Sequence, residues 1–167
     1  FTITGEGTDA GEYANTIDED NITITAEDGT NVKDNYTVKC IYGTLTVRKR
    51  NITIKAGDAG REYNGEPLTN PECEIIDSGN PDEGLAPNQT LVAAVAKGSI
   101  TDVGTAPNVV DESSIIIKDA NGNETTKNYK ITTEDGVLTV GKRKIEVKTS
   151  TKEFTYNGTD QFDTNIT

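Results

Sequence analysis

Few residue clusters in this chain could do chemistry, and each has a simpler structural explanation. The stretch from Asp119 to Glu124 resembles the start of a calcium-binding loop, in which oxygen ligands alternate along the loop before a glycine at its sixth position. Here Gly122 stands fourth, and Ala26 replaces Asp119 at the equivalent position 93 residues earlier. The dipeptide Asn121-Gly122 therefore predicts a tight hairpin turn at this point.

Structural roles are also the simpler interpretation of the remaining acidic, lysine and tyrosine residues. We expect the acidic clusters to be solvated loops, because nothing fixes two carboxylates at a glycosidase separation. A Lys–Asn isopeptide crosslink would need a buried lysine, but alternation places Lys55 on the Thr53 side of its strand. The tyrosines are expected to close β-cores with their hydroxyls bonded, although they could stack on sugars. The residues concerned are Asp18–Asp20, Asp82-Glu83 and Asp111-Glu112; Lys55/Lys148 with Asn35/Asn128 and Asp9/Asp102; and Tyr36/Tyr129 with Tyr63/Tyr156.

Composition narrows the function classes further. The chain of 167 residues has no His, which excludes His-dependent triads, His metal sites and His pH switches. Its net charge of −12 argues against nucleic acid and anionic membranes as partners. No apolar run is long enough for a transmembrane helix. We therefore predict a protein that is not an enzyme, with no catalytic, cofactor-binding or metal-binding residues and no cofactor.

The elements that would position these residues repeat at a fixed offset of 93 residues. Residues 1–74 align with 94–167 without a gap, so that Asn35-Tyr36 falls on Asn128-Tyr129 and Tyr63-Asn64-Gly65 on Tyr156-Asn157-Gly158. A period of this length indicates a domain in tandem and not a short solenoid unit. Such β-modules usually serve as spacers or binding modules.

The basic triplet Arg48–Arg50 and its counterpart Gly141–Arg143 join successive strands without a loop, as a linker between modules would. We place boundaries there, giving the end of a first repeat (1–50), a complete repeat (51–143) and the start of a third (144–167). In another phase, 1–74 and 94–167 are the folded units and 75–93 is the linker. A third option is that the tail of one monomer completes the head of the next through an exposed strand edge.

Short runs in which apolar and polar residues alternate dominate the chain, and they predict strands with one buried and one solvent-exposed face. They predict a mainly β fold of tandem, Ig-like antiparallel sandwiches. The alternative is a small α+β module with one short helix near Leu85 or Leu91. The expected strands are 21–25, 36–40, 44–47, 51–55, 114–118, 129–133, 137–140 and 144–148.

Cys40 and Cys73 do not occupy equivalent positions, because their counterparts are Thr133 and Ile166. A disulfide-stapled module would repeat its cysteines, so we expect two buried thiols. The alternative is a disulfide between modules. The chain begins within a strand at Phe1–Thr4, and we expect it to be an internal fragment of a larger protein.

The order of motifs resembles the MBG/YDG-type repeats of bacterial cell-surface proteins. Those repeats open with a strand and Tyr-Asp-Gly-Thr, continue through a Gly-Asp loop and Gly-x-x-Thr-x-x-Gly-Thr, and close with Asn-Tyr and Gly-Thr-Leu-Thr-Val. This chain departs from the pattern in having Asn for Asp in Tyr-Asn-Gly. Its matching segments are Ile52–Ile54, Tyr63–Thr69, Gly98–Thr105, Asn128–Ile131, Gly136–Val140 and Tyr156–Thr159.

The resemblance implies a secreted, wall-attached protein of Gram-positive or gut bacteria, with stalk or adhesin roles and no catalytic residues to transfer. The first expectation is a non-enzymatic extracellular spacer whose partners are neighbouring repeats, anchored to the cell wall by regions outside this segment. The second is an adhesion module that binds a glycan or a host protein. The third is an accessory domain of a cell-wall or polysaccharide-acting enzyme.

Overall fold

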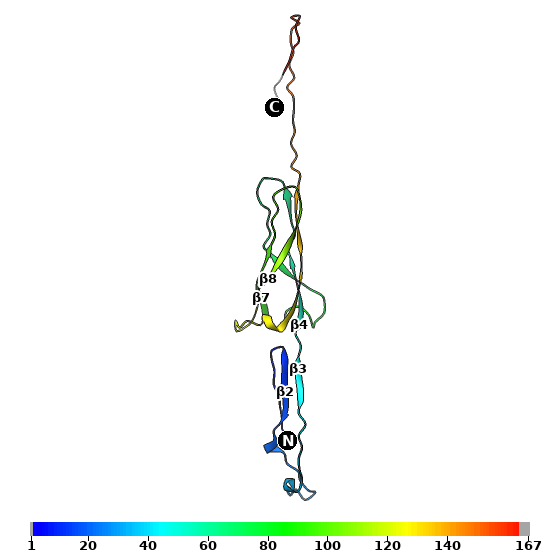
Figure 1. The fold of residues 1–167 in the computed structure, drawn as a ribbon, viewed down its shortest axis with the longest axis vertical. Helices are drawn as coiled ribbons and strands as arrows, with labels where there is room; N and C mark the ends of the chain where they lie inside the picture. The colour runs from blue at the N-terminus through cyan, green and yellow to red at the C-terminus, as the bar shows by residue number, and fades with distance from the viewer. Residues whose placement is uncertain (1, 164–167) are drawn as a thin grey trace.

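The protein is elongated and mainly β in the computed structural model, which describes residues 2–163 (Figure 1). About 45% of it is strand, in three small sheets that include a curled half-barrel. Across residues 2–163 there is no α-helix, only the 3₁₀ turns η1 (Glu19–Asn21), η2 (Lys33–Asn35) and η3 (Thr126–Asn128). Phe1 and residues 164–167, including Ile166, lie outside the described range.

Three parts follow one another along the long axis (Figure 1). The head (residues 2–47) holds a sheet of order β1-β2-β3, in which β1 (Ile3–Thr4) and β3 (Gly43–Val47) pair antiparallel with β2 (Gly11–Ile17). The central module spans residues 50–141. The tail (residues 142–163) extends beyond it, and none of the tail's described residues belongs to one of these strands.

The central module is built from two sheets, of order β5-β10-β8-β7 and β6-β4-β9. Most neighbours are antiparallel, but β4 pairs with β9 and β5 pairs with β10 in parallel. The first two strands of the module are therefore held beside its last two. The strands are β4 (Arg50–Ala56), β5 (Ala59–Glu62), β6 (Cys73–Ile76), β7 (Gln89–Lys97), β8 (Gly104–Asp119), β9 (Tyr129–Glu134) and β10 (Gly136–Gly141).

Alternation along these strands buries apolar side chains of both sheets, and all of those named below except Leu138 and Val140 pack in one core cluster. From Ile52 onward every second residue of β4 is buried, as period-2 side-chain placement requires. The buried apolar residues are Ile52, Ile54, Ala56, Ala96, Val110, Ile115, Ile117, Tyr129, Leu138 and Val140. The buried amide of Asn108 donates to the carbonyls of Gly57 (2.9 Å) and Asn70 (2.7 Å), which ties β8 to the loops that follow β4 and precede β6.

Five of the eight expected strands form, four of them in the central module. The predictions for 44–47, 51–55, 114–118, 129–133 and 137–140 are confirmed. Those for 21–25, 36–40 and 144–148 are wrong, and all three lie in the head or the tail. In the central module the counterparts of these segments pair with β7, β4 and β9, so the sequence pattern forms a strand only where its ladder partner is present.

The predicted fold class is confirmed as mainly β, whereas the Ig-like sandwich is not shown by this arrangement. The short helix near Leu85 or Leu91 is wrong. Residues 82–86 form turns around Gly84, whose φ is +74°, and Leu91 lies within β7. Pairing of β7 with β8 along nearly its whole length overrides the helix preference of its three alanines.

Candidate functional site

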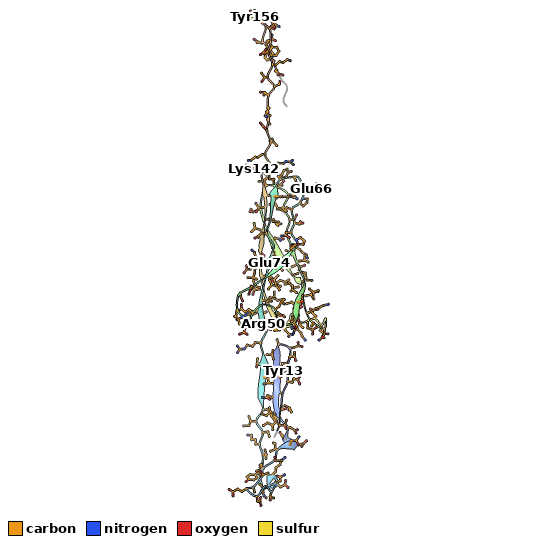
Figure 2. The ribbon with its side chains drawn as sticks, turned by 180° about the vertical axis from the view of Figure 1, so that it is seen from behind. Tyr13, Arg50, Glu66, Glu74, Lys142 and Tyr156 are labelled. Carbon is orange, nitrogen blue, oxygen red and sulfur yellow. The ribbon has the colours of Figure 1, made fainter. Side chains whose placement is uncertain are left out.

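The junction between the head and the central module is the most defined contact between two parts of this chain. β3 ends at Val47 and β4 begins at Arg50, so only Arg48 and Lys49 connect the two sheets. Figure 2 shows Arg50 at the boundary between the parts and Lys142 at the opposite end of the module. A connector of two residues leaves few backbone torsions about which the head can turn.

A second contact, made by side chains, also crosses this junction. Asp9, in the loop between β1 and β2, lies against η3 of the central module. The amide of Asn128 donates to Asp9 Oδ1 (2.8 Å) and accepts the backbone N–H of Ala10 (2.8 Å). Lys127 Nζ lies 2.7 Å from Asp9 Oδ2. The head is therefore attached to the module at two separate places, the connector and this loop.

The electrostatics of the contact favour its charged form. The hydrogen bond from Lys127 lowers the pKa of Asp9 below its usual value, and the bond from Asn128 lowers it further. The same partner raises the pKa of Lys127. Both side chains are largely exposed, so solvent and salt screen the pair. The contact therefore fixes orientation more than it adds stability.

Arg50 fixes the base of the central module next to the connector. Its guanidinium donates to three backbone carbonyls, those of Gly84 (3.0 Å), Pro81 (2.6 Å) and Glu83 (2.8 Å). The backbone supports the same contact, since the N–H of Gly84 donates to the carbonyl of Asn51 (2.9 Å). The planar fork of arginine suits this set of acceptors, which a lysine could not reach together. Within the basic triplet, Arg50 therefore stabilises the base of the central module and is not only part of a solvated linker.

The opposite end of the module carries a mainly apolar groove of about 470 Å³. Val103 in this groove is the repeat counterpart of Ala10, which contacts η3 at the first junction. The groove is therefore the equivalent of the surface on which the head meets the central module. Its lining residues are Tyr63, Asn64, Val103, Lys142, Arg143 and Ile145.

The candidate calcium loop is a turn, as predicted. Asp119 Oδ1 accepts the backbone N–H groups of Asn121 (2.9 Å) and Asn123 (2.8 Å), and Oδ2 accepts the side chain of Asn123 (3.0 Å). Gly122 has φ +85° and closes the turn with a bond to the carbonyl of Asp119. These hydrogen bonds lower the pKa of Asp119. In the part of the chain that the structure describes, no three His, Cys, Asp or Glu side chains group to hold a metal.

The candidate isopeptide partners are not brought together. Lys55 Nζ lies 3.6 Å from Asp58, whereas Asn128 contacts Asp9 at the far end of the module. Lys55 pairs in register with Glu134, five residues along β9 from Tyr129, the neighbour of Asn128. Lys148 lies in the tail with Glu146 at 3.0 Å. Asp9 does contact Asn128, but as a partner across the junction.

The tyrosines divide by location. Tyr129 is 4% exposed, and its hydroxyl donates to Gln89 Oε1 (2.6 Å) and accepts the N–H of Ala86 (2.9 Å), which confirms the core role. Tyr36, its counterpart, is 58% exposed, and Tyr63 and Tyr156 are exposed as well, so the core role is wrong for these three. The difference between Tyr129 and Tyr36 follows from β4 and the 80–89 segment, which cover only Tyr129.

Cys40 and Cys73 are free thiols, each half-buried. The predicted full burial is therefore wrong in degree, and no disulfide joins the head to the central module. Burial raises the pKa of the Cys73 thiol. Cys73 lies on β6 and packs against the core cluster, whereas Cys40 lines a groove of the head.

The junction contact is the feature that sequence reasoning missed. Asp9 and Asn128 both belong to repeated positions, Asp9/Asp102 and Asn35/Asn128, but the sequence gives no sign that they meet across modules.

No helix within residues 2–163 is long and apolar enough to cross a membrane. Comparisons with protein-family models, curated proteins and solved structures find no match for the chain.

Proposed function

We propose that this chain is a non-enzymatic spacer, part of an extracellular stalk built from tandem repeats. The observation that carries the proposal is the junction, where a two-residue connector and the Asp9–Lys127–Asn128 contact join head and central module at two places. Two attachments resist bending and twisting more than a single flexible linker does. Such a rod has the properties needed to hold a binding domain away from a surface.

Several sequence features support the same proposal. The net charge of −12 makes neighbouring rods repel one another and keeps them soluble. The motif order resembles MBG/YDG-type repeats, which is the basis for proposing a bacterial cell-surface location. We also propose that repeats begin at residues 51 and 144, and that the two facing sheets of the central module are a small sandwich of the broad Ig-like kind.

The experiment that tests the spacer is a distance measurement across the junction. Spin labels on β2 of the head and on β8 of the central module report their separation by pulsed electron paramagnetic resonance. The unaltered chain should give a narrow distribution. Asp9→Ala should broaden it, because the loop then keeps only the bond from the Ala10 N–H to Asn128. Glu12→Ala removes the same charge from β2 and is the matched control.

A broad distribution in the unaltered chain would contradict the proposal, since a flexible linker would then join the parts. An equal broadening by Asp9→Ala and Glu12→Ala would show that the loss of one negative charge, and not this contact, changes the junction. Both outcomes are read directly from the width of the distance distribution.

A second candidate function is adhesion by the module itself. The groove of about 470 Å³ with the exposed Tyr63 favours it, because an aromatic ring beside an apolar hollow can stack on a sugar. Screening the chain against a glycan array separates the two proposals. Binding that Tyr63→Ala abolishes would favour adhesion, whereas the spacer alone requires no glycan.

A further inference from the structure

Two Asn-Gly dipeptides lie in exposed loops of the central module, at Asn64-Gly65 and Asn121-Gly122. The two glycines have nearly the same φ, +87° and +85°, and a Cβ added to either would meet nothing within 4 Å. An asparagine before a glycine can cyclise, because glycine has no side chain to crowd its nitrogen as that nitrogen attacks the asparagine side chain. The hydrogen bonds of the two loops differ, and this difference decides which dipeptide reacts.

In the first loop the side chain of Asn64 is held in place and activated. Its Oδ1 accepts the backbone N–H of Glu66 at 3.0 Å. A donor on a carbonyl oxygen stabilises the negative charge that an attacking nucleophile creates there, as in an oxyanion hole. Glu66 is itself fixed, because the guanidinium of Arg61 donates to its carbonyl and Pro67 follows it. The carbonyl carbon that would be attacked is therefore preorganised in the folded chain.

The attacking nitrogen is also available in this loop. Among residues 2–163, the N–H of Gly65 donates to no protein acceptor. Asn64 and Gly65 are both exposed, so water can take up the proton that the nitrogen loses. The repeat counterpart Asn157 has the same turn, with its Oδ1 accepting the N–H of Thr159 at 3.1 Å. The arrangement thus belongs to the Tyr-Asn-Gly motif and not to one loop alone.

The second dipeptide is arranged in the opposite way. The N–H of Gly122 donates to the carbonyl of Asp119 at 3.0 Å, and this bond must break before the nitrogen can attack. The backbone N–H of Asn121 is held by Asp119 Oδ1 at 2.9 Å. Within the described part of the chain, no donor reaches the side-chain oxygen of Asn121. Asn121-Gly122 is therefore a natural control within the same module.

We propose that Asn64 is a site of spontaneous deamidation, a reaction of this dipeptide with water. The nitrogen of Gly65 bonds to Cγ of Asn64, the Cγ–Nδ2 bond breaks, and ammonia leaves with the proton that the Gly65 nitrogen gave up. Water then adds to one of the two carbonyls of the resulting succinimide ring, and the C–N bond at that carbonyl opens. The product is aspartate or isoaspartate at position 64, and the reaction needs no oxidant or reductant.

The new carboxylate arises in the groove at the far end of the central module. Asn64 lines this groove together with Tyr63, Lys142 and Arg143. A neutral amide thus becomes a negative charge near two basic side chains, an attraction that solvent and salt weaken. Isoaspartate also adds one carbon atom to the main chain between Tyr63 and Gly65. The groove that could bind a glycan therefore changes its charge and its shape as the chain ages.

Peptide mapping by mass spectrometry tests the proposal on the chain aged in mildly alkaline buffer below its melting transition. Deamidation adds about 1 Da, and chromatography separates the aspartate and isoaspartate products. The peptide with Asn64 should convert about three- to tenfold faster than the peptide with Asn121, because a hydrogen bond of ordinary net strength corresponds to about this factor in rate. In urea, where both loops unfold, the two rates should approach each other.

A matched pair of variants tests the role of the Glu66 N–H. Glu66→Pro removes this donor to Asn64 Oδ1 and should slow the conversion of Asn64. Glu66→Ala keeps the N–H, removes only an exposed side chain and should leave the rate unchanged. Circular dichroism melts of both variants check that the central module remains folded.

Equal rates for the two peptides in the folded chain overturn the proposal. A difference that persists unchanged in urea overturns it as well, because neighbouring residues and not the folded loops would then set the rates. Equal slowing by Glu66→Pro and Glu66→Ala overturns it too, since the side chain and not the N–H would then matter. Each of these results leaves the spacer and adhesion proposals standing, because those are tested by label distances and glycan binding.

Discussion

Tyr129→Phe is the change that tests most directly how the central module is held together. The substitution removes one oxygen and leaves the ring in place. That oxygen donates to Gln89 Oε1 at 2.6 Å and accepts the N–H of Ala86 at 2.9 Å. It thereby ties β9 to the start of β7 and to the loop that precedes β7.

The expected loss follows from these two bonds. An intramolecular hydrogen bond contributes about 0.5–1.5 kcal/mol net, so losing both should cost about 1–3 kcal/mol of unfolding free energy. The N–H of Ala86 would be left without its acceptor in a half-buried position, which favours the upper part of this range. For a module of this size, about 2 kcal/mol lowers the melting temperature by roughly 8–16 °C.

Thermal and urea denaturation followed by circular dichroism measure the effect, and hydrogen exchange of β9 peptides assigns it to the central module. Tyr36→Phe is the matched control, because the same repeat position is 58% exposed in the head. We expect a shift of less than about 0.5 kcal/mol for the control. Equal shifts for the two variants would refute the reasoning, since the hydroxyl would then act through the unfolded chain or the ring alone.

Three further predictions concern the module and its junction. Gly136→Ala should destabilise the central module by about 1–3 kcal/mol in urea denaturation because its Cβ would meet two carbonyl oxygens, whereas Gly43→Ala should be nearly neutral. Arg50→Lys should cost about 1–3 kcal/mol through lost bonds to three carbonyls, with Arg48→Lys as the neutral control by the same measurement. The pKa of Asp9 is lowered in the folded chain, so the ion pair of Asp9 with Lys127 should persist above pH 3.8 and be lost as pH falls through this lowered pKa. Label distances across the junction should broaden only in that acidic window, and Asp9→Asn should abolish the pH dependence.

Sequence alternation predicted β4, β9, β10 and the second half of β8, each of which has its ladder partner in the central module, but it did not predict β5 or β6. Ser114–Lys118 and its counterpart Asn21–Thr25 have the same β-branched pattern, yet only the first is a strand. The first pairs with β7, and the second has no such strand beside it among residues 2–47. Local pattern therefore specifies which face a residue would occupy, while tertiary pairing decides whether the strand exists.

For a similar reason, the sequence predicted the connector at the junction but not the side-chain contact across it. The basic triplet marked the connector, because its charge and its place between two alternating runs are visible in one dimension. The contact of Asp9 with Asn128 joins residues 119 apart in the sequence, and no periodicity encodes their approach. The three carbonyl acceptors of Arg50 were equally hidden, since backbone oxygens carry no sequence signature.

The parallel pairs explain how such a module can carry tension. In the stalk that we propose, tension would pull the central module at Arg50, where β4 begins, and at Gly141, where β10 ends. The β4–β5 segment and the β9–β10 segment run side by side in parallel, so this pull slides them past each other along the strands. Interstrand hydrogen bonds lie across that direction and are loaded together, whereas an antiparallel hairpin pulled at its open end would release them one by one. The parallel pairing of the entry strands with the exit strands would therefore resist tension in the spacer that we propose.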